Sequence, residues 1–259
     1  DGIRDVAVTG VQTCALPILR VMRRADTQIE NTAPYRALRG AANMMMLRYG
    51  EAAEDFNHFS LSSDDEDRFW LAAARAKGPN PAAQAETMIQ TGAIARTYPR
   101  KVKIQLALIG VDAAIAAGDD FDAQGFLDMI SRETPSANEQ AAIDYEDGKL
   151  KQKIGENQGA LAQYRKVEAS PSLLYSVLST RDRMELEHKL GTLKTEDLIE
   201  GYEKLRYRWR GDGIELDMLL RLADLYSELN DYPTALRTLK ITMAYFNNDP
   251  RVDEAAEKM

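Results

Sequence analysis

A helical-hairpin pattern recurs along this chain at intervals of 34 to 38 residues, and this period constrains the fold more than any other feature. In four copies an alanine lies 12 positions after an anchor residue of the first helix, and a large apolar residue lies 16 positions after the same anchor. Residues at such spacings share one face of a helix, so each copy predicts two closely packed helices. The six anchors are Gly40, Ala74, Val111, Gly148, Leu186 and Ala223.

The second helix of each copy is expected to bury its residues at the matching offsets. The copies at Ala74 and Leu186 are more degenerate, since the first fits only if one residue is deleted and the second places leucine at the small position. The expected core positions are Ala52, Phe56 and Phe59; Ala85 and Ile89; Ala123, Leu127 and Ile130; Ala160, Tyr164 and Val167; Leu198, Tyr202 and Leu205; and Ala235, Leu239 and Thr242.

Helix-start signals agree with this division. Ser63 with Glu66, and Ser136 with Glu139, have the spacing of a capping box. Sustained alternation and Asn-Gly turns, the usual strand signals, are missing from the sequence. A capping residue followed by proline also marks three further helix starts, at Asn80-Pro81, Ser170-Pro171 and Asp249-Pro250.

The copy from Glu215 to Pro250 is the clearest. Its small and apolar positions are Leu219, Leu222, Ala223, Tyr226, Ala235 and Leu239. This pattern resembles the tetratricopeptide repeat (TPR), a helix-turn-helix unit of about 34 residues. The resemblance covers nearly all of residues 33–259 and implies an all-α fold, a right-handed α-solenoid of about six antiparallel helical hairpins.

The TPR resemblance also implies a groove that is lined by first helices and holds a peptide or a partner helix. The lysine and asparagine spacing of the TPR carboxylate clamp is absent, and acidic Asp217 and Asp224 favour a basic or polar segment. The candidate groove residues are Asp217, Leu220, Asp224 and Ser227 in the last copy, and Tyr145, Lys149 and Gln152 in the fourth.

Motifs for catalysis are absent from the sequence, which contains no phosphate-binding glycine loop, nucleophile elbow or zinc-protease motif. The net charge of −8 argues against a general nucleic-acid or anionic membrane surface. No apolar run approaches the roughly 18 residues of a membrane span. We therefore expect a non-enzymatic interaction scaffold with a protein partner and with no cofactor, metal or small-molecule substrate. The alternative is a regulatory or substrate-recruiting arm of a larger enzyme.

Three local patterns have both a functional and a structural interpretation, and the structural one is favoured in each case. The stretch Arg206–Arg210 could stack on single-stranded nucleic acid, but it also suits a helix end before Gly211. Residues 64–67 are acidic, as at a helix N-terminus, and lack the ligand pattern of a calcium loop. His58 is expected to be partly buried on a second helix, and Met44–Met46 are expected to pack in the core.

Residues 1–18 differ in origin from the rest of the chain. Val8–Ile18 resembles the translation of a common sequencing adapter, Asp1–Asp5 matches its upstream part, and the two residues between them fall at its sample index. A signal peptide is disfavoured because Gln12 and Thr13 interrupt the apolar core. We expect 1–18 to be a non-native adapter-derived segment, followed by a TPR-like α-solenoid over residues 19–259.

The same interpretation predicts a bacterial metagenomic fragment that is truncated at its N-terminus and at its C-terminus, where residues 251–259 match the start of a seventh hairpin. The only cysteine, Cys14, lies in the adapter-like segment. Cysteine usage therefore does not report the compartment, and we expect a soluble protein of the cytoplasm or the periplasm.

A clean genomic copy of the gene should lack the codons for residues 1–18. Amplifying the locus from genomic DNA and sequencing across this region tests the expectation. Finding those codons in the genome would show that the segment is native.

Overall fold

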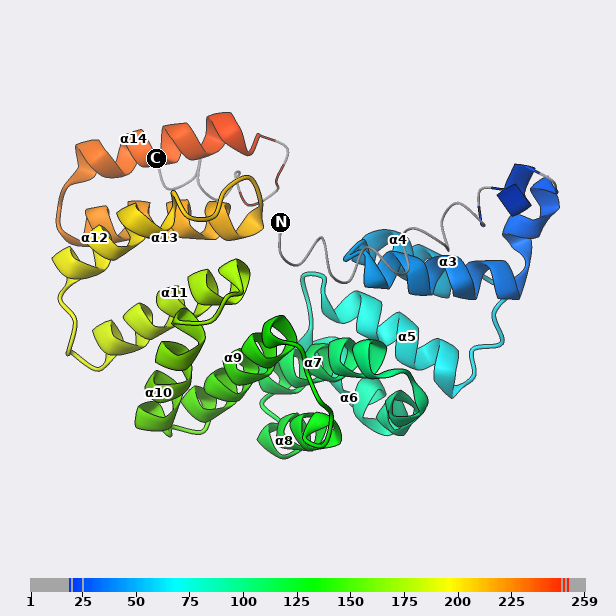
Figure 1. Ribbon diagram of the computed structural model, residues 1–259. Coiled ribbons are helices and arrows are strands. Elements are labelled where there is room, and N and C mark those ends of the chain that lie inside the picture. Colours follow the sequence, from blue (N-terminus) through cyan, green and yellow to red (C-terminus); the bar gives the residue numbers. More distant parts are fainter. Residues whose placement is uncertain (1–18, 20, 25, 248, 250, 252–259) are drawn as a thin grey trace. The chain divides into compact units, whose positions relative to one another are not determined.

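The computed structural model describes residues 19, 21–24, 26–247, 249 and 251 (Figure 1). Within these residues the regular elements are helices and no strand occurs, which confirms the predicted all-α class. The adapter-like segment 1–18 and most of the predicted seventh hairpin lie outside the described residues. Among the described residues, no helix is both long enough and apolar enough to cross a membrane.

Six pairs of consecutive helices pack as hairpins, at the six predicted places. Two 3₁₀ segments, η1 (Thr27–Asn31) and η2 (Gly92–Thr97), accompany them. The pairs are α3 (Ala33–Met45) with α4 (Tyr49–Phe56), α5 (Asp65–Ala76) with α6 (Ala82–Thr91), α7 (Arg100–Ala117) with α8 (Asp120–Ile130), α9 (Ala137–Lys153) with α10 (Asn157–Glu168), α11 (Leu173–Lys189) with α12 (Thr195–Leu205), and α13 (Gly213–Glu228) with α14 (Tyr232–Tyr245).

The chain divides into two compact units between Ser172 and Leu173, and each unit has its own core. In the first unit the first helices of successive hairpins are neighbours, since α3 packs on α5, α5 on α7, and α7 on α9. In the second unit α12 packs on both α11 and α13, around the buried side chains of Val177, Leu198 and Leu222.

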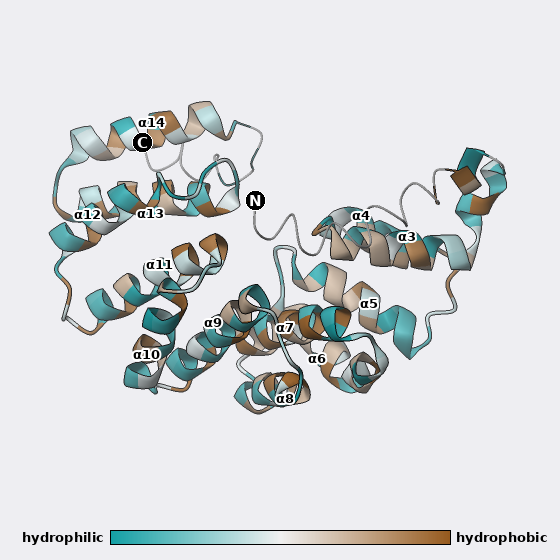
Figure 2. Ribbon diagram, in the orientation of Figure 1, coloured by the Kyte–Doolittle hydropathy of each residue, from teal (hydrophilic) through white to brown (hydrophobic). Residues whose placement is uncertain are grey.

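Helix α7 lies at the centre of the first unit. It packs against α5, α6, α8 and α9, and hydrophobic residues are concentrated along it (Figure 2). Leu106 and Ile109, which share a face, are both buried, and so is Val111, which lies on a different face. A helix that is apolar on most sides is buried on most sides. Charged residues on α7, such as Asp112, therefore need partners nearby.

In three hairpins of the first unit, the close approach of the two helices depends on a glycine in the first helix. A Cβ atom added at Gly110 would lie 2.7 Å from the ring of Phe126, closer than two carbon atoms can pack. In the third hairpin this contact begins one residue before the predicted anchor Val111. The same contact recurs at a spacing of 16 residues in three hairpins of the first unit, in the pairs Gly40–Phe56, Gly110–Phe126 and Gly148–Tyr164.

The predicted second-helix core positions are buried, with two exceptions. Ile89 is partly buried against the main core of the first unit. Phe59 was expected in the first hairpin, but its side chain is 85% exposed and lies beyond the end of α4. Leu61, two residues later, packs against that core instead. Of the Met44–Met46 run, Met44 and Met45 are buried, as predicted.

The early end of α4 explains the error at Phe59 and corrects the placement of His58. Helix α4 stops at Phe56, with Asn57 as its C-cap, so His58 lies in the following turn and not on the helix. There the His58 Nδ1 atom accepts a hydrogen bond from the Ser60 backbone N–H at 3.2 Å. This local side-chain contact competes with continuation of the helix.

The two predicted capping boxes have different outcomes. Ser136 caps α9, and Glu139 returns the hydrogen bond, so this box is confirmed. The Ser63 box is wrong, because Asp64 is the N-cap of α5 and accepts from the Asp67 N–H at 2.9 Å. Ser63 has a φ of 57° and precedes the cap. Acidic residues in the first turn then stabilise the helix N-terminus, as expected for residues 64–67.

Substitution of glycine by alanine tests the close packing. Gly110→Ala is expected to lower the free energy of unfolding by about 1–3 kcal/mol, because the new methyl group collides with the Phe126 ring. Gly125 lies in α8 of the same hairpin, and a Cβ there meets no atom within 4 Å. Gly125→Ala should instead raise the free energy of unfolding by about 0.5–1 kcal/mol. Urea titration followed by circular dichroism measures both, and equal effects would contradict the packing.

Candidate functional site

The four candidate groove residues of the last hairpin lie along α13. Asp217 is half-exposed and accepts a hydrogen bond from Arg251 Nη1 at 2.6 Å. Asp224 is half-buried and Ser227 is exposed, although the Ser227 hydroxyl donates to the Ala223 carbonyl at 3.0 Å. The carboxylates at the two acidic positions can therefore face a basic group.

Leu220, the apolar member of this row, is partly buried. It packs against the small cluster formed by Ala223 and Leu239. Its side chain thus contributes to the hairpin interior as well as to the row between Asp217 and Asp224.

The three candidate residues of the fourth hairpin lie on α9. Lys149 contacts Tyr145, and both Tyr145 and Gln152 contact Tyr164. Tyr145 is buried, with its ring centroid 6.1 Å from that of Tyr164 on α10. Lys149 Nζ lies over the Tyr145 ring, 5.5 Å from its centroid, at the range of a cation–π contact. Gln152 accepts a hydrogen bond from the Tyr164 hydroxyl at 2.7 Å. Of the three, Lys149 and Gln152 keep partial exposure.

Lys149 also belongs to an ion network that spans three hairpins. Its ammonium group donates to Glu146 at 2.8 Å and pairs with Asp112 on α7. The second oxygen of Asp112 pairs with Lys77, the C-cap residue of α5, at 3.0 Å. We call Lys77, Asp112, Glu146 and Lys149 the cross-hairpin network. Two ammonium groups and two carboxyl groups alternate in it, so each ammonium group lies next to a carboxyl group.

Burial and mutual attraction shift the pKa values in the cross-hairpin network. Burial alone would raise the pKa of Asp112, but Lys149 and Lys77 lower it to about 2. Burial and the charge of Asp112 raise the pKa of Glu146 to about 8, against the opposing effect of Lys149. Burial would lower the pKa of Lys149, but the two carboxylates raise it above its usual value. Glu146 is therefore the member of the network that titrates near neutral pH.

Of the four residues in this network, only Lys149 was predicted from the sequence as a candidate site residue. Its partners are linked across one repeat period, since Lys77 and Asp112 are 35 residues apart and Asp112 and Lys149 are 37 apart. First helices pack side by side in this unit, so residues one period apart become neighbours. Comparing the charges of equivalent positions in successive copies would have identified the alternation.

The stretch Arg206–Arg210 follows α12 and does not form its last turn, because that helix ends at Leu205. The expected helix end at Gly211 is therefore wrong, although Gly211 does have a positive φ of 91°. The polar side chains of the stretch are engaged within the second unit, which favours the structural interpretation. The pairs are Arg206 with Glu203, Arg208 with Ser176, Trp209 with Asp212, and Arg210 with Glu215.

Candidate metal ligands are dispersed in the part of the chain that the structure describes. No group of three or more His, Cys, Asp or Glu side chains there is arranged to hold a metal ion. The carboxylates of the two units instead pair with lysine and arginine, as Asp112 and Asp217 do.

Comparison with known proteins rests on structure, since no protein-family model and no curated protein matches the sequence. A chain in the crystal structure of the APC/C hetero-tetramer Cut9–Hcn1 matches with a TM-score of 0.57 and 11% sequence identity. The match covers 99% of this chain and 47% of that chain. The fold is TPR-like. This chain therefore spans about half the length of its TPR-like neighbour, and the likeness at this identity concerns the fold alone.

The pH dependence of stability tests the environment of Glu146 in this TPR-like fold. The folded chain holds the Glu146 proton more tightly than the unfolded chain does. The contribution of this proton to the free energy of unfolding is therefore complete below pH 4.5 and is lost as the pH rises to about 8. Glu146→Gln should remove this loss, which we expect to exceed about 1 kcal/mol.

Urea titrations at several pH values measure the difference between wild type and Glu146→Gln. Glu156→Gln, at an exposed position just before α10, serves as the matched control and should keep the wild-type profile. A Glu146→Gln profile parallel to that of the wild type across this range would contradict the assigned environment.

Proposed function

We propose that this chain is a non-enzymatic interaction scaffold that binds a peptide or a partner helix along the first helices of its hairpins. The TPR-like architecture supports a role in protein–protein interaction. In the first unit, the first helices of successive hairpins pack side by side. Rows of this kind form the extended binding surfaces of repeat proteins.

The observation that carries the proposal is the pair between Asp217 and Arg251. Asp217 belongs to the candidate groove row on α13, and half of its side chain is exposed while it holds a guanidinium group at 2.6 Å. The charge and geometry of this position thus suit a basic side chain. A partner with lysine or arginine would satisfy Asp217 in the same way, in place of Arg251.

The remaining candidate residues would contribute in different ways. Asp224 would provide a second carboxylate on the same face of α13, about two turns after Asp217. Leu220 would lie between the two as an apolar contact, and Ser227 would add a hydrogen-bonding group. In the fourth hairpin, Lys149 and Gln152 would offer polar contacts, while buried Tyr145 would hold Lys149 in place. The preferred partner segment is therefore basic or polar with an aliphatic residue.

Selection from a random peptide library displayed on phage tests this function on the full chain. Selected peptides should be enriched in lysine and arginine. The double substitution Asp217→Lys with Asp224→Lys should weaken their binding on the order of tenfold, because attraction is replaced by repulsion at two half-exposed positions. Fluorescence anisotropy of labelled peptides measures the affinity.

A matched control carries the same change of charge on a second helix. Glu196→Lys with Glu200→Lys alters two exposed residues of α12 and should leave the affinity within about twofold. Peptides that bind the α13 double variant as tightly as they bind the wild type would contradict the proposed row.

A further inference from the structure

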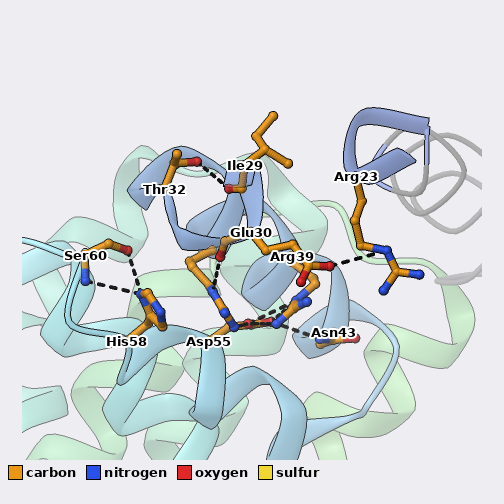
Figure 3. A network of polar contacts seen from close by, with 10 residues as sticks. Arg23, Ile29, Glu30, Thr32, Arg39, Asn43, Asp55, His58 and Ser60 are labelled. Atoms are coloured by element: carbon orange, nitrogen blue, oxygen red, sulfur yellow. Dashed lines mark hydrogen bonds and ion pairs between the residues drawn. The ribbon is translucent and has the colours of Figure 1, made fainter. Parts of the chain in front are cut away.

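A buried carboxylate on the first hairpin holds two arginines (Figure 3). Asp55 of α4 is fully buried. It accepts hydrogen bonds from Arg36 Nη1 at 2.9 Å, from Arg39 Nε at 2.9 Å, and from Asn43 Nδ2 at 3.3 Å. Arg39 Nη2 adds a second contact at 2.5 Å, so this guanidinium group binds Asp55 through two nitrogens. Bidentate pairing of this kind fixes the orientation of an arginine.

One guanidinium group is sufficient to neutralise Asp55, so the second leaves an excess positive charge. Glu30, whose backbone carbonyl contacts Arg36, uses its carboxylate to pair with Arg23 at 3.3 Å. Arg36 contacts only the backbone carbonyl of Glu30, at 2.5 Å. The cluster Arg23, Glu30, Arg36, Arg39 and Asp55 therefore carries one uncompensated positive charge, on a chain whose net charge is −8.

The Arg39 guanidinium group lies over the Tyr35 ring, 5.5 Å from its centroid. Arg36 binds its partners through Nε and Nη1, and Arg39 binds Asp55 through Nε and Nη2. Their side chains remain 16% and 28% exposed, whereas that of Asp55 is 1% exposed. The carboxylate is thus enclosed, and the two guanidinium groups reach solvent.

His58, in the turn after α4, adds no competing charge. Desolvation and the two guanidinium groups lower its pKa, against the opposing effect of Asp55. A lowered pKa favours the neutral imidazole at physiological pH.

These residues lie on a different face of α3 from the candidate groove. In the repeat register, the α3 positions equivalent to Asp217, Leu220, Asp224 and Ser227 are Pro34, Ala37, Ala41 and Met44. Arg36, Arg39 and Asn43 fall between these positions and face Asp55 on α4. The excess charge is thus separate from the row that the proposed function uses.

We infer that Arg36 and Arg39 form a second interaction site, which binds a carboxylate of an acidic segment in a partner protein. Asp55 accepts hydrogen bonds from both guanidinium groups and neutralises one of the two positive charges. The planar fork of guanidinium matches a carboxylate. A single excess charge on an acidic chain suits one glutamate or aspartate contact and not the repeated phosphate contacts that nucleic acid requires.

The test measures binding of fluorescein-labelled hexaglutamate to the full chain by fluorescence anisotropy. Arg39→Gln should weaken binding about fivefold, the value of one partly exposed ion pair, and added salt should weaken it further. Arg132→Gln is the matched control, since Arg132 is exposed after α8 and its loss changes the net charge equally. The control should change the affinity by less than about twofold.

Asp55→Asn separates binding from a purely structural role. Asp55→Asn and Arg39→Gln both break the same ion pair, so a structural effect would change the affinity in the same direction in both. If the site binds a carboxylate, Asp55→Asn raises the excess charge and should tighten binding while Arg39→Gln weakens it. Circular dichroism establishes that both variants are folded.

Three results would overturn the inference. The first is no detectable binding of hexaglutamate to the wild type, and the second is weakening by Asp55→Asn as well as by Arg39→Gln. The third is tighter binding of a single-stranded oligothymidylate with the same number of charges, which would indicate a nucleic-acid surface instead.

Discussion

The close approach of the two helices within a hairpin is the constraint on which the other contacts depend. Where the ring of Phe126 or Tyr164 lies on a glycine, the helix axes are held together with little freedom. The contact recurs at one spacing in three hairpins of the first unit, and the first helices of this unit pack side by side. That arrangement brings Asp112 within reach of Lys77 and Lys149, although a full repeat separates them in the sequence.

Much of this fold could be predicted because its signals are local. The small residue and the large residue that pack together in a hairpin are separated by a short turn, so their spacing survives in the sequence even where the residue types vary. The Leu186 copy shows this, since Leu198, Tyr202 and Leu205 are all buried although the small position is occupied by leucine. Periodicity reports burial more directly than residue identity does.

The errors lie where a local side-chain contact sets the end of a helix, or where a side chain's partner is distant in the sequence. Asp64 displaces Ser63 as a helix cap because both residue types cap well, and spacing alone does not choose between them. The exposure of Phe59 follows from a turn stabilised by His58, which a helical spacing does not reveal. The charge cluster around Asp55 was missed for another reason. Its partners Arg36 and Arg39 are 19 and 16 residues away, and their hydrogen bonds depend on how α3 crosses α4.

The cross-hairpin network also bears on how the first unit opens. In a repeat protein, each hairpin contacts mainly its neighbours, and local unfolding can begin at one repeat and stop at the next. Asp112 pairs with Lys77 at the end of α5 and with Lys149 on α9. Opening the third hairpin therefore leaves both lysines without this partner. These three hairpins are thereby linked into one cooperative segment, in which amide hydrogens should exchange together and not hairpin by hairpin.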